Sequence, residues 1–562
     1  MDYLTHTRLS FFLLLIAISL GKLQAATPHA SDKPSQASPA GGPITFRSPL
    51  AKAFVVPQSL PGVGFPIQQS YAGRLNIATD PKQTAEAFFW MIPADNARGT
   101  QTPKNFTTFF VYSHQDHDVT GGRKTCEEPI PSQASPAGGP ITFRSPLAKA
   151  FVVPQSLPGV GFPIQQSYAG RLNIATDPKQ TAEAFFWMIP ADNARGSKHV
   201  TMWINGYDVC SSLYGAFRGS GPITMSLEGG KPVKNPYSWT RSTNVIYLDV
   251  LPKVGFTRGT YSVNSSRDVG VLVFSFLKSF LKVFPEMNGL NLFLAGNYYT
   301  GTYANYAAQK IYAQQSQLGL KLQGMILVDA LIAASDFQMY AATTKFVTEN
   351  NDVFKFDAAK LQKLQATDKQ CGFSEYFKKY LTYPPSGHFP EIVKALDPSN
   401  PPYFTPDCMN LYSQVKTKTR SYPIGEHTLM LLSFHLDVHG SPTRFEPMVF
   451  PNDDGSGLAT DILPDVIQRS KKVVIMHAEL DATLPVEGMR LALQNVTWAG
   501  KQGFQKPLTT NLIVAGKQSG KYQSERGLTF VQVAKSGAMI AHDQGEVALT
   551  VLDYLLGNRP AL

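Results

Sequence analysis

The residues best placed to do chemistry surround a tight turn between an apolar run and a helical pattern. The segment Gly296-Asn297-Tyr298-Tyr299-Thr300-Gly301 follows the apolar residues 290–294 and precedes a helix-like stretch that begins near Ala304. A turn with this glycine spacing can present a nucleophilic side chain at the end of a strand. The central position holds Tyr298, where a serine would be needed. The turn therefore has the pattern of a nucleophile site but lacks the expected nucleophile.

The elements that must position this turn alternate in type after residue 197. Short apolar runs alternate with helical patterns, which predicts an α/β fold with a central, mostly parallel sheet flanked by helices. Residues 168–190 alternate as an antiparallel hairpin leading into the sheet, and residues 335–440 break the alternation and predict an inserted helical cap. The expected strands are 199–205, 244–250, 290–295, 323–329, 472–477 and 528–533, and the expected helices are 267–284, 303–317 and 544–556.

An internal repeat divides the N-terminal half of the chain. Residues 34–99 are identical to residues 131–196. Repeat arrays normally drift between copies, so perfect identity indicates a very recent duplication or an error in the gene model. The second copy runs directly into the strand expected at 199–205, so the main domain is predicted to span residues 131–562. Residues 26–130 are then an extension that holds the redundant copy and a spacer, and that copy is expected to be loosely attached or mis-packed.

The first residues of the chain resemble a secretory signal. Arg8 precedes an apolar run over residues 9–20, and small residues offer a cleavage site before Ala26. Because this run is too short to cross a bilayer, residues 1–25 are predicted to be a signal peptide and the mature protein to be free of the membrane. Secretion is expected, with the vacuole as another destination. Potential glycosylation sites are then Asn105, Asn264 and Asn495.

Charge and cysteine content exclude some functions. The net charge is +10, but the basic residues are scattered, so no nucleic-acid partner is expected, although affinity for anionic polymers stays open. No Cys-x-x-Cys pair occurs, so neither a metal site nor a cofactor is predicted. Cys371 and Cys408 bracket much of the expected cap and are disulfide candidates, as is Cys210. The oligomeric state is left open.

Several blocks occur in the order found in a known family. They include Trp203 to Leu213, Asn235 to Trp239, Asn244 to Asp249, the 296–303 turn, a cap segment at 380–385, and Gly537 to Gln544. Over about residues 165–558 the chain thus resembles the serine carboxypeptidases of the α/β-hydrolase superfamily, particularly fungal secreted members. The resemblance implies that fold, a serine-type exopeptidase ancestry, and peptide C-termini as binding partners.

The resemblance also assigns roles to individual positions, and most of the required groups are missing. Catalysis in the family needs serine, aspartate and histidine in that order. The corresponding positions hold Tyr298, Asp481 and Ala538, so only the acid remains. The implied oxyanion-hole donors are the backbone N–H groups of Tyr207 and Tyr299, and the implied ligands of the substrate carboxylate are at Asn205, Asn297 and Gly219.

These losses favour an inactive relative, and two alternatives stay open. One is an extracellular module that binds a peptide or a protein on the hydrolase fold. The other is an active hydrolase with unconventional groups, in which Tyr298 attacks and His542 or His477 serves as base. A tyrosine needs a base to ionise, and its ring places the oxygen several ångströms beyond a serine's. The unconventional enzyme therefore requires Tyr298 within hydrogen-bond reach of a histidine.

Overall fold

The computed structural model describes the main body of the chain and, before it, the four strands of a separate sheet. The described residues are 141–389, with short gaps at 158, 194, 207–209, 227–230 and 335, then 406–419 and 459–562. The predictions for the signal peptide, Asn105 and Tyr207 lie outside the described residues, as does much of the second half of the expected cap. Two compact units are present, Met1–Pro131 with Val153–Pro163, and Ser132–Val152 with Ile164–Leu562.

The first repeat copy forms a sheet of its own in the N-terminal unit. Its strands, in sheet order, are β1 (Val55–Val56), β2 (Ser70–Asn76), β3 (Ala85–Ile92) and β4 (Thr107–His114). Tyr71 pairs with Met91 in this sheet, as Tyr168 pairs with Met188 in the second copy. The identical sequences therefore form hairpins with the same register. In the first copy, β4 from the spacer pairs with β3 and adds a further strand to the sheet.

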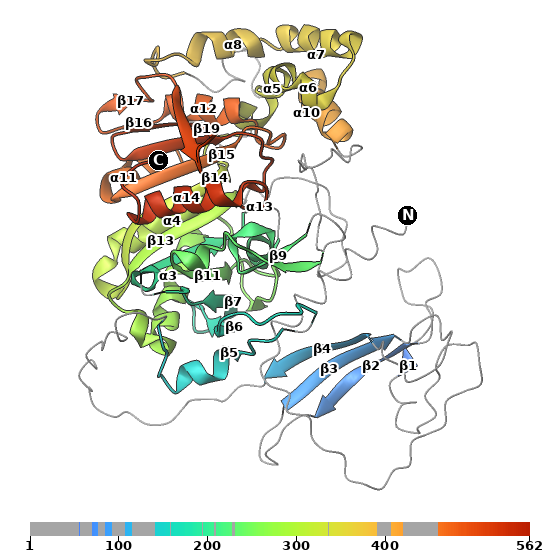
Figure 1. Ribbon diagram of the computed structural model, residues 1–562, viewed down its shortest axis with the longest axis vertical. Helices are drawn as coiled ribbons and strands as arrows, with labels where there is room; N and C mark the ends of the chain where they lie inside the picture. The colour runs from blue at the N-terminus through green and yellow to red at the C-terminus, as the bar shows by residue number, and fades with distance from the viewer. Residues whose placement is uncertain are drawn as a thin grey trace. The chain divides into compact units, whose positions relative to one another are not determined.

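A twelve-stranded sheet forms the centre of the main unit (Figure 1). Its order is β18-β19-β20-β15-β14-β13-β8-β11-β7-β6-β5, with β12 paired to β7. The six strands from β20 to β11 run parallel to one another, whereas β6 and β7 form the predicted antiparallel hairpin. The central strands are β8 (His199–Ile204), β11 (Asn244–Asp249), β13 (Asn291–Tyr298), β14 (Lys321–Ala330), β15 (Lys472–Ala478) and β20 (Leu528–Val533). The predicted mostly parallel sheet is confirmed.

The other strands lie toward the two edges of this sheet. Strands β5 (Val152–Val153), β6 (Ser167–Asn173), β7 (Thr181–Ile189) and β12 (Arg258–Thr260) lie on the β11 side, and β18 (Thr510–Val514) and β19 (Lys517–Glu525) lie on the β20 side. Two short antiparallel ribbons stand apart, β9 (Ile223–Met225) with β10 (Pro232–Lys234) and β16 (Thr497–Trp498) with β17 (Lys501–Gln502).

Helices flank the sheet because each presents an apolar face to it. Helix α3 (Ser266–Val283) begins at a capping box formed by Ser265 and Asp268, which satisfies backbone N–H groups at its start. Its Phe276 and Phe280 pack against Phe186 of β7. The other flanking helices are α4 (Thr300–Ala313), α11 (Leu463–Arg469), α12 (Val486–Asn495) and α14 (Gly545–Leu556).

The described part of the cap is helical, as predicted. It holds α5 (Thr343–Glu349), α6 (Asn351–Phe354), α7 (Ala358–Gln370), α8 (Phe373–Tyr380) and α10 (Pro406–Thr419). A disulfide joins Cys371 to Cys408, which confirms that pair among the candidates, whereas Cys210 is buried outside any disulfide. Closing a loop of this length stabilises a fold by roughly 3–4 kcal/mol. The cap therefore has both a crosslink and an apolar core of its own, which includes Phe346, Phe373 and Leu411.

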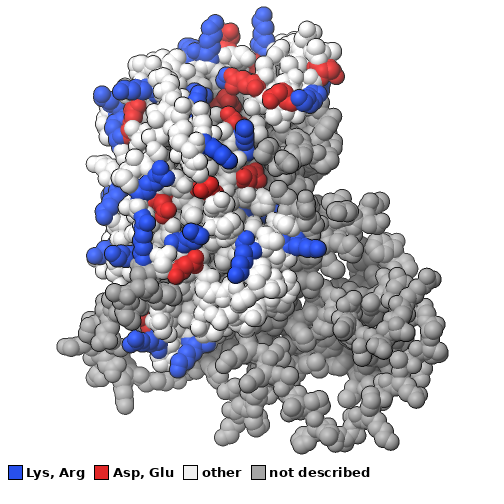
Figure 2. Space-filling model, in the orientation of Figure 1, with Lys and Arg blue, Asp and Glu red and all other residues white. Residues whose placement is uncertain are grey.

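The surface of the main unit carries charges of both signs. On the face shown in Figure 2, Lys and Arg are scattered among Asp and Glu and form no single patch. Within the part of the chain that the structure describes, no helix is both long and apolar enough to cross a membrane.

Candidate active site

The turn after β13 keeps the geometry of a nucleophile site. Strand β13 ends at Tyr298, whose φ of 48° is a left-handed conformation that strains a residue with a side chain. Helix α4 begins two residues later, at Thr300. A Cβ on Gly206 would overlap the Thr300 nitrogen and the Asn297 carbonyl oxygen. Only glycine therefore fits where the loop after β8 passes close to this turn. The backbone of the turn is therefore retained, strain included.

The side chain of Tyr298 is directed at the acid. It is buried, and its hydroxyl donates to Oδ1 of Asp481 at 3.4 Å. In a catalytic triad a histidine stands between the nucleophile and the acid, takes the proton of the first and is oriented by the second. Here the two groups contact each other directly, and no imidazole intervenes.

Asp481 lies in the loop after β15 and is almost completely buried. Its Oδ1 also accepts from the backbone N–H of Thr483 at 2.7 Å. Burial raises the pKa of Asp481 to about 7, although hydrogen bonds from Thr483, Leu484 and Tyr298 oppose the rise. The retained acid is therefore a loop carboxyl whose raised pKa lets it exchange a proton near neutral pH.

The position expected for the histidine offers no base. Ala538 is buried between β20 and α13 (Ile540–Asp543), and its methyl group cannot accept a proton. The nearby His542 has Nε2 3.1 Å from the Met225 carbonyl oxygen and Nδ1 3.3 Å from Asp543 Oδ1. Both of its ring nitrogens therefore face partners other than Tyr298.

One of the two expected oxyanion-hole donors is already engaged. The backbone N–H of Tyr299 donates to the carbonyl oxygen of Gly206 at 3.2 Å. An oxyanion hole works only if its donors are aimed at the site where the negative charge develops. The Tyr299 donor would have to break this bond to act on a substrate.

The three positions expected to hold a substrate carboxylate have structural contacts instead. Asn297 accepts the N–H of Gly206 at 3.1 Å, and Asn205 donates to the Cys210 carbonyl oxygen at 3.2 Å. Gly219 has a φ of 120°, and a Cβ there would overlap the backbone of Ala541. A glutamate therefore does not fit at Gly219, and the two asparagines brace the loop after β8.

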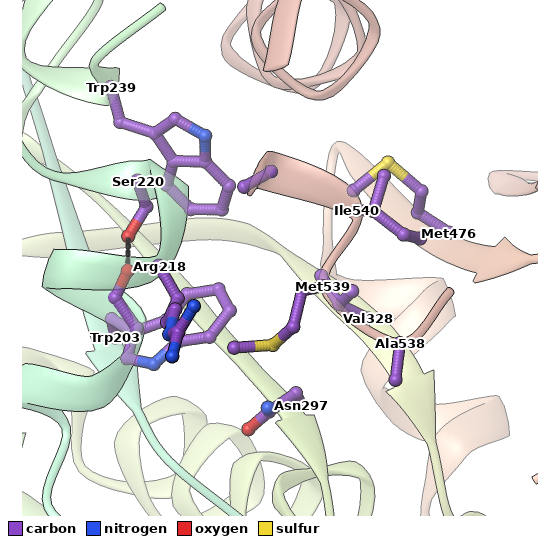
Figure 3. Close-up of a pocket in the computed structure, with 12 residues that line it drawn as sticks. Trp203, Arg218, Ser220, Trp239, Asn297, Val328, Met476, Ala538, Met539 and Ile540 are labelled. Carbon is purple, nitrogen blue, oxygen red and sulfur yellow. Dashed lines mark hydrogen bonds between the residues drawn. The ribbon is translucent and has the colours of Figure 1, made fainter. Parts of the chain in front are cut away.

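A cavity beside the turn is too small for a peptide end. Its lining includes Trp203, Arg218, Trp239, Asn297 and Met539, and Figure 3 shows Met539 extending across it toward Trp203. The space between these side chains is about 360 Å³ when open solvent is counted, but the cavity proper is only about 20 Å³. The smaller value decides what fits, and it corresponds to roughly one water molecule.

The structure adds to the acid's surroundings Asp329, which the sequence interpretation missed, and His477, which it considered only as the base of an unconventional enzyme. Asp329, near the end of β14, and His477, in β15, each place a donor atom so that the set with Asp481 lies within 4.8 Å. Asp329 accepts the Ala478 N–H at 2.7 Å, and its pKa is raised well above the ordinary value, first by burial and then by the charge of Asp481. Burial lowers the pKa of His477 to about 4, so its ring is neutral. A usable signal existed, because the carboxyl ends of adjacent parallel strands meet at one edge of a sheet.

Comparison with protein families gives one match that spans most of the main unit. The model of the family described as serine carboxypeptidase matches residues 158–426 and 444–558. Among the relatives, a carboxypeptidase Y homolog of Arthroderma benhamiae is 28% identical over 76% of this chain and 90% of its own length. Serine-type carboxypeptidase F of Aspergillus niger is 26% identical over 73% of this chain and 87% of its own length.

A solved structure agrees with the fold. The prohormone-processing carboxypeptidase Kex1 of Saccharomyces cerevisiae superposes with a TM-score of 0.54 at 18% identity. The match covers 73% of this chain and 96% of the Kex1 chain. At this identity the similarity shows the α/β-hydrolase architecture alone.

Proposed function

This chain belongs to the serine carboxypeptidase family, and we propose that it is a non-hydrolysing member that keeps the α/β-hydrolase fold and has lost the peptidase reaction. Its ancestry is that of an enzyme removing C-terminal residues from peptides. The observation that carries the proposal is the hydrogen bond from Tyr298 to Asp481, which joins the nucleophile position to the acid without a histidine. Removing either the nucleophile or the base of a comparable triad costs on the order of 10⁶ in turnover.

Two further observations support the same conclusion. The Tyr299 N–H donates a hydrogen bond to the Gly206 carbonyl oxygen, and the cavity beside the turn has a volume of only about 20 Å³. A substrate would therefore need both a freed oxyanion donor and a reopened cleft before any reaction began.

A tyrosine-based hydrolase is the weaker candidate. Asp481 accepts the hydrogen bond of the Tyr298 hydroxyl, and burial raises the pKa of this carboxyl to about 7. Transferring a proton from a phenol of pKa about 10 to this carboxylate is uphill by about 4 kcal/mol. Nothing at Ala538 then protonates a leaving amine.

We propose in addition that the protein is secreted or vacuolar and acts by binding. The apolar run after Arg8 supports export, and the relatives' peptide-processing names support a peptide end as the ligand. A bound peptide end requires Met539 to move out of the cavity (Figure 3). Sequencing the N-terminus of the exported protein tests the first part, and Ala26 is the expected first residue.

Covalent labelling tests the loss of the nucleophile. A fluorophosphonate reacts with a serine activated by a base, so the wild-type protein should not be labelled in this cleft. The double variant Tyr298→Ser/Ala538→His restores the missing groups beside the retained Asp481 and is expected to be labelled at position 298. Labelling of the wild-type protein at any cleft residue, located by mass spectrometry, would contradict the proposal.

A further inference from the structure

Helix α12 is the element of the main body that holds the cap. Arg490 donates to the Tyr383 hydroxyl at 3.4 Å, and Gln494 donates to the Thr382 carbonyl oxygen at 2.6 Å. Leu491, which lies between the two donors in the sequence, belongs to the apolar cluster of the cap. One face of α12 is therefore part of the interface between cap and body.

The first turn of α12 buries a carboxyl group on this same face. Glu487 precedes Leu491 by four residues, a spacing that places the two side chains on one side of a helix. Here α12 packs against α5, α8 and the short helix η8 (Asp336–Tyr340) of the cap. Glu487 is 4% exposed, and among the described residues its Oε2 has no hydrogen-bond partner. Such an atom is rare in a native protein, and an ionised carboxylate in its place is costly.

The charges around Glu487 do not offset its burial. Burial raises the pKa of Glu487 to about 7, and the charge of Glu349 on α5 adds to the rise. A hydrogen bond from its own backbone N–H, Arg490 on α12 and Lys345 on α5 oppose it. Lys345 forms an ion pair with Glu349, so its charge is already matched.

The other titratable groups beside α12 have partners of their own. On α8, Glu375 pairs with Lys378 at 3.9 Å with most of both side chains exposed, and Lys379 lies over an aromatic ring of its own helix. Strand β15 also packs against α12, and its His477 is uncharged because burial lowers its pKa to about 4. At the other end of α12, His388 is exposed and bonds the last residue of the helix.

We propose that Glu487 makes the attachment of the cap sensitive to pH, so that the cap is held on α12 while this carboxyl is protonated and loosens when it ionises. Loosening lets water reach the carboxylate and thereby removes the cost of burying its charge. This behaviour of the cap does not depend on whether the protein binds or cleaves peptides.

The direction of the effect follows from the two states of the cap. The carboxyl has a pKa of about 7 when the cap is held and the ordinary value of 4.5 when water reaches it. Ionisation therefore favours the loosened state, and the attachment is firm below about pH 4.5 and weakens as the pH rises to about 7. Each pH unit between these values increases the loosened population by up to about tenfold.

Hydrogen exchange of the full-length protein, followed by mass spectrometry, tests this property. After correction for the intrinsic exchange rate at each pH, peptides from α5 to α8 should lose protection between pH 4.5 and pH 8, on the order of 100-fold. Glu487→Gln cannot ionise and should keep at pH 8 the protection that it has at pH 4.5. Glu375→Gln, an exposed change on α8, is the matched control and should lose protection as the wild type does.

A second variant keeps the test decisive if Glu487→Gln does not fold. Glu349 is half-exposed on α5, and Glu349→Gln removes the negative charge that raises the pKa of Glu487. Its cap should therefore lose less protection than the wild-type cap. A wild-type cap equally protected at both pH values, or a Glu349→Gln cap whose loss matches the wild type, would overturn the proposal. A loss that persists in Glu487→Gln would assign the pH dependence to another group, such as His388, and would also overturn it.

Discussion

At the residue scale, a single substitution changes both the chemistry and the electrostatics of the turn. Tyr298 occupies the strained backbone position at the end of β13. Its hydroxyl donates directly to Asp481, whereas in a catalytic triad a histidine lies between these two positions. The sequence alone identified the substituted positions, because they stand in ordered blocks. It did not reveal the contact between Tyr298 and Asp481, because these residues are far apart in the sequence and the contact depends on the direction in which the Tyr298 side chain points.

The raised pKa of Asp481 predicts that ionising this carboxyl lowers the stability of the folded protein as the pH rises. Its folded pKa of about 7 exceeds the unfolded value near 4, so the native state prefers the protonated acid. The cost is absent below about pH 4, grows as the pH rises, and levels off above about pH 7 at an order of 3–4 kcal/mol. Asp481→Asn removes it and should be more stable than wild type at pH 8 but not at pH 4.

Chemical denaturation of the wild-type and Asp481→Asn proteins across this pH range checks that prediction. A stability difference between them that does not change with pH would show that Asp481 does not titrate as described.

At the element scale, the elements that sequence reasoning found are those with the strongest patterns. The central parallel strands are buried on both faces and read as continuous apolar runs, so all six were predicted to within a few residues. Strands β18 and β19 were missed because half of their residues are exposed and β19 is almost entirely polar, so neither has a continuous apolar run. The Asp329–His477–Asp481 cluster was missed because strand order, which brings its members together, is not written in any local pattern.

The structural position of a potential glycosylation site decides whether its asparagine can carry a glycan. Asn264 is exposed ahead of α3, whereas Asn495, at the end of α12, donates its side-chain nitrogen to the Phe389 carbonyl oxygen at 3.3 Å. A glycan replaces one of the two hydrogens on that same nitrogen with a bulky group, so a glycan on Asn495 would crowd this contact with the cap. We expect glycopeptide mass spectrometry of exported protein to find sugar on Asn264 and none on Asn495. Asn264→Gln is the control, and a glycan on Asn495 would refute the prediction.

At the scale of the whole molecule, two identical hairpins have different partners. The second copy pairs β7 with β11 in the main sheet, whereas the first pairs β3 with β4 in the N-terminal unit. The sequence shows the duplication but not which further strand pairs with each hairpin. Which copy matters for the main fold is therefore a question of tertiary pairing.

The duplication supplies a control with the same local sequence. Trp187 in the second copy is completely buried, and Trp90 is its counterpart in the first. Trp187→Ala should lower the stability of the main unit by about 3–5 kcal/mol through lost burial and a cavity. Trp90→Ala should leave that transition unchanged in calorimetry. Equal losses from the two substitutions would mean that the first copy is part of the main fold.

The most direct test of the central claim is release of the C-terminal residue from an N-blocked dipeptide at mildly acid pH. Purified wild-type protein should release none, and an Asp481→Ala variant should behave identically, because the retained acid has no histidine to orient. Release by the wild-type protein that disappears in the variant would contradict the account and show that another nucleophile and base work in the same cleft.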